Sequence, residues 1–265
     1  MHQTLWIHTA AAGAMLLGLT PSPLIGADQT SHCRSTGLNP AGLADSEGIA
    51  SATDAGQRVA PPAFRLATTY ENQIDLQGYL VSEKFDGVRA LWTGSQLITR
   101  GGLVIQAPVW FLEQLPCVPL DGELWMGRGR FAEVSGIVRR LQPVPEDWWE
   151  ISYLVFDLPG MDAPFIERHR ALQALIQDAN ATETEKHGGS DAGAKHRGPA
   201  RVVDQQPASG QAALMQRLNA VVAAGGEGLM LHRRAAPYRA GRSDDLLKVK
   251  PYQEGDARVI AHLPG

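Results

Sequence analysis

Hydrophobic and polar residues alternate in short runs from residue 63 onward, and Gly, Asp and Pro separate the runs, which is typical of a mixed α+β domain. The runs that predict strands are GYLVSEKF, VRALW, QLITR, PLDGELW, ISYLVFDL (Ile151 to Leu158), EGLMLHR and DLLKVK. Asp86 and Gly87 separate the first two runs, and an Asp-Gly pair between apolar alternations predicts a two-residue β-hairpin.

Three segments have helical periodicity instead. The segment APVWFLEQL has Pro108 in a first-turn position and predicts a short helix. In ERHRALQALIQ, the apolar residues Leu172, Leu175 and Ile176 share one side. The segment SGQAALMQRLNAVVAAGG predicts a helix that Ser209 caps and Gly225 ends.

The N-terminal region has a different pattern. The apolar run of residues 10–19 is too short to span a bilayer and is followed by prolines and small residues, which predicts a signal peptide over residues 1–27. Residues 1–8 lack Lys and Arg, so a misplaced start or a buried N-terminal helix stays open as the alternative. Residues 28–62 lack periodicity and predict a flexible linker, and residues 179–200 predict a disordered surface insertion because they are nearly devoid of apolar side chains.

Composition sets limits on the class of protein. The chain has 265 residues, of which 44% are hydrophobic and 20% charged, so it can bury a substantial core. A formal net charge of −4 argues against a uniformly basic nucleic-acid coat but allows a local basic face. Cys33 and Cys117 lie too far apart in sequence for a metal-site spacing, and either a disulfide between them in an exported chain or free thiols would suit them.

Lysines supply the first candidate chemistry. A lysine is a poor nucleophile at neutral pH because its ordinary pKa is about 10.4, so a nucleophilic Lys84 needs burial or neighbouring cations. In DLLKVK the strand period of two places Lys248 and Lys250 on one face. Such a pair suits a phosphate and could lower the pKa of a third lysine; the plainer alternative is a solvated edge strand.

Carboxylates complement these lysines. Asp86, Glu123 and Glu227 each lie at a strand end or in a Gly-flanked turn, where a side chain can face a cleft. Magnesium binds proteins through one or two carboxylates together with substrate phosphates. Each acid taken alone also fits a turn residue or a surface charge.

Taken in order, EKFDGVR, TRGG, LDGEL, YLVFDL, EGLML and LLKVK closely resemble the successive motifs of the covalent nucleotidyltransferase superfamily. This superfamily comprises ATP-dependent DNA ligases, RNA ligases and mRNA capping enzymes. GYLVSEKFDGVRALW, APVWF and LDGELWMGRGRF are most similar to the small bacterial ATP-dependent DNA ligases that act in the periplasm. The resemblance implies an α+β nucleotidyltransferase (adenylation) domain over residues 63–252, with antiparallel sheets flanked by helices, and the start of a truncated OB-fold over residues 253–265.

The resemblance also implies roles for individual residues. Lys84 would attack the α-phosphorus of ATP and carry AMP as a phosphoramidate. The matching positions imply metal binding by Asp86 and Glu227, nucleotide or 5′-phosphate contacts from Arg89 and Arg100, a ribose contact from Glu123, adenine stacking on Phe156, an adenine-edge contact from Ser82, and α-phosphate binding by Lys248 and Lys250. For Phe156, plain core packing is the alternative.

The implied function is sealing of nicks in double-stranded DNA during repair, replication or recombination, with ATP and Mg²⁺ or another divalent metal. The candidates for phosphate contacts are Arg128, Arg130, Arg139, Arg140, Arg233, Arg234, Arg239 and Arg242. We expect a monomer without stable membrane association, in the periplasm if the export signal works and in the cytoplasm otherwise.

Two alternatives stay open at this stage. RNA ligase or capping chemistry shares the same motifs. A remnant that binds nucleotide or DNA without turnover is the other, because the final family motif, which orients the departing pyrophosphate, follows the opening OB-fold strand and is not in this sequence.

Overall fold

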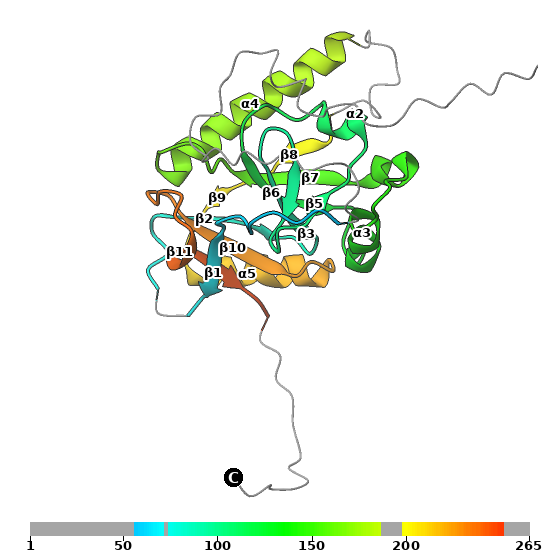
Figure 1. Ribbon diagram of the computed structural model, residues 1–265. Coiled ribbons are helices and arrows are strands. Elements are labelled where there is room, and N and C mark those ends of the chain that lie inside the picture. The colour runs from blue at the N-terminus through cyan, green and yellow to red at the C-terminus, as the bar shows by residue number, and fades with distance from the viewer. Residues whose placement is uncertain (1–55, 72–73, 187–197, 252–265) are drawn as a thin grey trace, which may run out of the picture.

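The computed structural model describes residues 56–71, 74–186 and 198–251, and these form two β-sheets with helices on their outer sides (Figure 1). This arrangement confirms the predicted α+β class with sheets flanked by helices. No helix in these three ranges is long and apolar enough to cross a membrane.

The first sheet has five strands in the order β1-β11-β10-β2-β9. Its pairs are antiparallel except β1 with β11, which is parallel. The strands are β1 (Arg65–Thr69), β2 (Tyr79–Lys84), β9 (Gln206–Pro207), β10 (Gly228–Arg233) and β11 (Gly241–Val249).

The second sheet has six strands in the order β5-β4-β3-β6-β7-β8. Here only β7 and β8 run parallel. The strands are β3 (Val88–Trp92), β4 (Leu97–Thr99), β5 (Val104–Ile105), β6 (Leu120–Trp125), β7 (Ser152–Asp157) and β8 (Ala200–Val202).

Alternation along the strands explains the layering. In the first sheet, one face is apolar and packs on α5 (Gln211–Ala223), with Val81, Leu229 and Leu247 against Leu214 and Leu218. In the second sheet, the outward face carries a larger apolar core covered by α2 (Val109–Leu112), α3 (Phe131–Val138), the 3-10 helix η1 (Pro145–Glu150) and α4 (Phe165–Lys186). The other face of each sheet is free to line a polar site.

Every strand and helix predicted from the sequence is present, and most of their ends lie within two residues of the predicted ends. Two differences are larger. β11 begins at Gly241, ahead of the DLLKVK run, and α4 continues to Lys186. The insertion predicted as disordered is therefore helical over residues 179–186, because Ala and Glu favour a helix even without apolar neighbours.

The predicted β-hairpin at Asp86 and Gly87 is wrong. The strands on either side belong to different sheets, since β2 pairs with β10 and β9 while β3 pairs with β4 and β6. The chain crosses from one sheet to the other at this corner. A Cβ at Gly87 would lie 2.4 Å from the carbonyl oxygen of Leu124, so the corner requires glycine for its close approach to β6.

Two further details differ from the sequence predictions. Ser209 does not cap α5: the helix begins after Gly210, whose φ is 110°, and the Ser209 hydroxyl donates to the carbonyl of Pro207. Gly225 does end the helix with φ at 82°. The predicted linker is structured at its end, where Arg58 bridges to Leu103 and Val59 donates to the carbonyl of Gly102.

The remaining domain predictions lie outside the described residues. These are the signal peptide of residues 1–27, the linker over residues 28–55, the OB-fold start of residues 253–265, and Cys33 of the candidate disulfide.

Candidate functional site

A cavity of about 370 Å³ lies between the two sheets. It brings together nine residues that the sequence predicted for nucleotide, catalytic or DNA contacts: Ser82, Lys84, Arg89, Arg100, Glu123, Phe156, Arg242, Lys248 and Lys250. Segments far apart in sequence meet here because β2, β10 and β11 are neighbours in one sheet while β3, β6 and β7 are neighbours in the other.

Strand register orders the cavity wall that the first sheet provides. Gly228 pairs with Lys84, Met230 pairs with Ser82 on one side and Lys248 on the other, and His232 pairs with Leu246. The wall therefore changes from lysines at one end to apolar side chains and His232 at the other. A charged end and an apolar end suit a molecule with a phosphate tail and a flat ring.

Lys84 and Lys250 share one carboxylate at the charged end. The Nζ of Lys84 lies 2.5 Å from Oε2 of Glu227, and the Nζ of Lys250 lies 2.7 Å from Oε1. Burial alone would raise the pKa of Glu227, but hydrogen bonds from Lys250 and Lys84 outweigh it, so the pKa is lowered and the group is a carboxylate. Sequence alone predicted these two lysines and this acid, and the structure places all three in contact.

Glu123 lies on the opposite wall, on β6. Burial raises its pKa to about 8, although Arg89 and Lys84 act in the lowering direction. Its carboxyl group therefore holds its proton at neutral pH, and it can donate as well as accept a hydrogen bond to a ligand hydroxyl.

Arg89 lines the cavity, but its guanidinium group already donates hydrogen bonds to other protein groups. It donates from Nε to Oδ1 of Asp121 at 3.0 Å, from one Nη to Oδ2 at 2.7 Å, and from the other to the carbonyl of Arg65 at 2.8 Å. Burial alone would lower the pKa of Arg89, but Asp121 raises it overall. The group also lies over the rings of Phe64 and Phe156, at 4.5 and 5.4 Å from their centroids, so it positions the aromatic wall.

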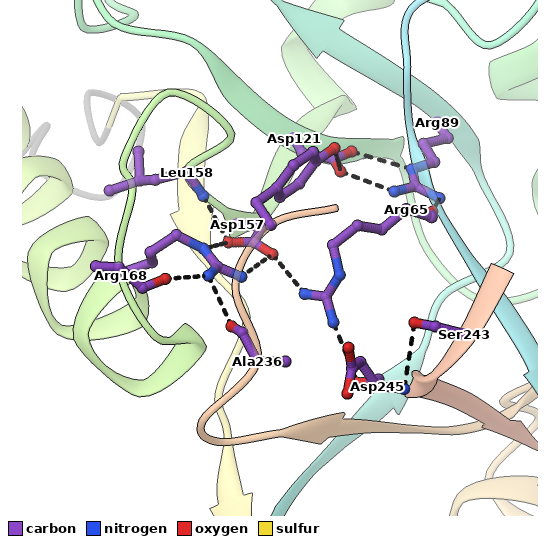
Figure 2. A network of polar contacts seen from close by, with 11 residues as sticks. Arg65, Arg89, Asp121, Asp157, Leu158, Arg168, Ala236, Ser243 and Asp245 are labelled. Carbon is purple, nitrogen blue, oxygen red and sulfur yellow. Dashed lines mark hydrogen bonds and ion pairs between the residues drawn. The ribbon is translucent and has the colours of Figure 1, made fainter. Parts of the chain in front are cut away.

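A buried network of polar contacts continues from Arg89 and ties the two sheets together (Figure 2). Asp157 of β7 accepts from Arg65 of β1 at 3.0 Å and from Arg168 of α4 at 2.6 and 2.9 Å. All three side chains are nearly inaccessible to solvent. Because each charge is paired, the network fixes the spacing of the walls without leaving an unpaired buried charge.

The sequence reasoning missed several residues of the cavity. Met230 and His232 belong to β10, where they alternate with the core residues Leu229 and Leu231. That period of two is the signal that could have identified them, since it places them on the face of the sheet that carries Lys248. The other cavity residues not singled out from the sequence are Leu66, Ala67, Glu83, Phe85, Val203 and Leu246.

Two predicted metal ligands do not line the cavity. Asp86 is exposed at the corner between the sheets, and Glu227 lies at the border, in its ion pairs with the lysines. Among the described residues, no group of three or more His, Cys, Asp and Glu side chains could hold a metal. The residues present fit an ion that needs one or two carboxylates plus phosphate oxygens, because Glu227 is a carboxylate that already attracts two cations.

The predicted DNA-contacting arginines fall into three groups. Ion pairs engage Arg128 with Glu83, Arg130 with Glu133 and Glu150, Arg140 with Asp147, and Arg233 with Asp245. Arg242 donates to the carbonyl of Ala67 at the cavity wall. Arg139, Arg234 and Arg239 are exposed, and the described part of the chain shows no ion pair for them.

Comparison with known proteins identifies relatives of this chain. No protein-family model matches the chain. The curated DNA ligase of Haemophilus influenzae is 32% identical over 200 residues, which cover 76% of this chain and 68% of that protein. A solved structure of a Lig E DNA ligase aligns with a TM-score of 0.63 at 36% identity, covering 77% of this chain and 74% of the other.

More distant structures share the fold. The Chlorella virus DNA ligase-adenylate aligns with a TM-score of 0.57 at 22% identity, covering 75% of this chain and 71% of that one. The ATP-dependent DNA ligase of bacteriophage T7 aligns with a TM-score of 0.54 at 17% identity, covering 71% and 68%. The chain therefore belongs to the DNA ligase family, and its fold is that of the ATP-dependent DNA ligases.

Proposed function

We propose that this enzyme uses ATP to seal nicks in double-stranded DNA, acting as a monomer through AMP carried on Lys84. The observation that carries the proposal is the convergence of Lys84, Lys250 and Glu227 at the charged end of a cavity whose walls also hold Lys248 and Phe156. The Lig E relative is described as binding DNA with a minimal scaffold, which supports a DNA substrate. Sealing of nicks would serve DNA repair, replication and recombination.

In the first step, the lone pair of Lys84 Nζ forms a bond to the α-phosphorus of ATP, and the bond from that phosphorus to the bridging oxygen breaks. Pyrophosphate leaves with the electron pair. Lys84 must first lose a proton, and Oε2 of Glu227, at 2.5 Å, is the nearest acceptor. Lys248 and Lys250 stabilise the negative charge on the transferring group, because their ammonium groups are already positioned before the reaction.

The base and ribose of ATP would occupy the rest of the cavity. Phe156 and Met230 provide apolar surfaces from opposite sheets, and Glu123 faces the same space with a protonated carboxyl that suits a ribose hydroxyl. Positioning by these residues supplies much of the catalysis, because phosphoryl transfer depends mainly on the orientation of the reacting groups and on stabilisation of the phosphate charge.

We also propose that a divalent metal such as Mg²⁺ assists, with Glu227 and Asp86 as the predicted protein ligands. When bound, the ion neutralises charge on the phosphates. Glu227 must exchange an ammonium partner for this role, so the lysines and the metal compete for one carboxylate.

The later steps move AMP from Lys84 to the 5′-phosphate of the nick, and the 3′-hydroxyl then attacks that phosphate and releases AMP. Arg100 is exposed at the cavity mouth, where it can reach a phosphate that enters from outside.

Incubation with ATP labelled at its α-phosphate tests the proposal. Covalent label should appear on the wild-type protein, disappear in Lys84→Ala and persist in Arg170→Ala, an exposed cation on α4 that serves as control. Nicked DNA, nicked RNA and labelled GTP are offered in parallel. Absence of label with every divalent metal would contradict autonomous adenylation, and stronger labelling by GTP would favour capping chemistry.

For the cellular location, we propose export to the periplasm, supported by the apolar run of residues 10–19 and the prolines that follow. Mass spectrometry of protein isolated from cells should find a mature N-terminus near Asp28. An intact Met1 would oppose export and leave the cytoplasm as the location.

A further inference from the structure

In addition to the buried network of Figure 2, an ion pair next to Lys84 joins the two sheets. Glu83 of β2 accepts hydrogen bonds from Nε of Arg128 at 2.9 Å and from one of its Nη atoms at 2.8 Å. Glu83 precedes Lys84 in the first sheet, whereas Arg128 follows β6 of the second sheet. This bidentate ion pair therefore crosses from the sheet that carries Glu123 to the strand end that carries the proposed nucleophile.

The same guanidinium group also holds the turn that leads to Glu227. Nη1 of Arg128 donates to the carbonyl oxygen of Ala224, at the C-terminal end of α5, at 3.2 Å. Two glycines connect Ala224 to Glu227. A Cβ at Gly226 would lie 2.9 Å from Oε1 of Glu83, so this turn packs directly against the carboxylate that Arg128 holds.

The backbone around Arg128 is shaped to direct this side chain toward the first sheet. Gly127 and Gly129 have φ values of 118° and 74°, in the region that favours glycine, so the chain turns sharply on both sides of Arg128. Arg130, in the same turn, donates instead to Glu133 of α3, which covers the second sheet. Arg128 thus bonds across the two sheets, whereas the pair of Arg130 with Glu133 stays within the layer of the second sheet.

We propose that Arg128 is a positioning residue for the transfer of AMP to Lys84. Because it holds both the strand end of Lys84 and the turn of Glu227, it fixes the distance of this pair from the sheet that carries Glu123. The inference rests on the proposed adenylation of Lys84. Misplacement of a reacting group by about 1 Å can slow a reaction by about 10²-fold, so a contact of this kind can control the rate without touching ATP.

Single-turnover adenylation without DNA tests the assignment, because a residue that only contacts DNA has no effect on this step. In Arg128→Gln, we expect the rate at saturating ATP to fall about tenfold or more, while the ATP concentration at half-maximal rate changes by less than about threefold. Glu83→Gln removes the same ion pair from the other sheet and should slow the rate similarly. Since both changes act through one contact, the double variant should be no slower than the slower single variant.

The matched control is Glu133→Gln. Glu133 also accepts two hydrogen bonds from an arginine of this turn, at 2.7 and 2.6 Å from Nε and Nη2 of Arg130, but it does not reach the first sheet. Its loss should leave the rate and its ATP dependence at wild-type values. Arg128→Lys keeps the charge without the bidentate geometry and should recover part of the rate lost in Arg128→Gln. Thermal melting of each variant shows whether it is folded.

A wild-type rate in folded Arg128→Gln would overturn the assignment of Arg128 while leaving the proposed function intact. The assignment is also overturned if the two single effects multiply in the double variant, if only the ATP concentration at half-maximal rate changes, or if Glu133→Gln slows the rate as much as Glu83→Gln does. Absence of adenylation in the wild-type protein would instead refute the proposed function. If Arg128→Gln does not fold, Glu83→Gln decides: a reduced rate supports the assignment and a wild-type rate overturns it.

Discussion

Lys84 Nζ and Glu227 Oε2 lie 2.5 Å apart because Glu227 immediately precedes β10, whose first residue, Gly228, pairs with Lys84 of β2. A Cβ at Gly228 would lie 2.3 Å from the carbonyl oxygen of Val249, so the backbone of β10 and the end of β11 are in close approach at the same point. This approach also brings Lys250, the next residue, to the second oxygen of Glu227. The backbone thus sets the contact between nucleophile and acid.

Replacement of Glu227 by glutamine tests whether this contact assists the nucleophile. The amide keeps the shape but removes the negative charge and the proton acceptor, so we expect single-turnover adenylation to slow by about 10²-fold. Glu167→Gln, an exposed acid in the first turn of α4, is the control and should react at the wild-type rate. Equal rates in all three proteins would show that Glu227 takes no part in the first step.

Glu123 predicts a pH dependence of stability. Its pKa is about 8 in the folded chain and near 4.5 when exposed, so the unfolded chain releases this proton earlier as pH rises. The stability associated with the protonated group is complete below pH 4.5, falls between 4.5 and 8 and levels above 8.

Glu123→Gln should remove this decline, because an amide does not titrate. We expect the variant to melt about 5 °C higher than wild type above pH 8, while the difference shrinks toward pH 4.5. Calorimetry over this range provides the measurement, with the exposed Glu146→Gln as control. A constant difference at every pH would contradict a raised pKa at Glu123.

The sequence predicted the strands and residues of the site better than the pairing of those strands. Lys248 and Lys250 share a face because the period of a strand is a local property, and the resemblance added Phe156 and the specific roles of Lys84 and Glu123. Whether Asp86-Gly87 forms a hairpin or a corner between two sheets could not be predicted in the same way, because both structures have the same local turn signal. The pairing of Lys84 with Gly228 and of Val88 with Leu124 decides between them, and both contacts are distant in sequence.

Two other differences have the same kind of cause. Residues 179–186 lack large apolar side chains, yet α4 extends through them, so low hydrophobicity was a poor guide where helix formers such as Ala and Glu are frequent. The period of two along β10 could have placed His232 on the cavity face, but not its environment. Burial lowers the pKa of His232 first, and Arg65 and Arg89 lower it further, and both causes arise only when the two sheets pack together.

Gly87→Ala tests the corner between the sheets. The new Cβ would meet the carbonyl oxygen of Leu124 at 2.4 Å and Cγ of Glu123 at 2.9 Å, so β6 and its acid must shift. We expect a loss of about 1–3 kcal/mol in the free energy of unfolding and slower adenylation. Gly136→Ala, in α3 with nothing within 4 Å of its Cβ position, should gain up to about 1 kcal/mol. Urea titration of both variants measures the difference; equal effects would contradict the close approach.

The arginines predicted to contact DNA can be separated by the salt dependence of binding. Arg139, Arg234 and Arg239 are exposed and show no ion pair within the described ranges, so each can neutralise a DNA phosphate without first breaking a contact. Arg130 is held by Glu133 and Glu150, whose negative charges already compensate it.

We therefore expect Arg139→Gln, Arg234→Gln and Arg239→Gln each to reduce the slope of log K against log salt by about one for a nicked duplex. Arg130→Gln should leave the slope nearly unchanged, because its loss releases two carboxylates and removes no phosphate contact. Fluorescence anisotropy with a labelled nicked duplex at several salt concentrations gives the slopes. If Arg130→Gln lowers the slope as much as the exposed arginines do, DNA binding must rearrange the ion pairs of α3, and the paired arginines belong to the DNA-binding surface as well.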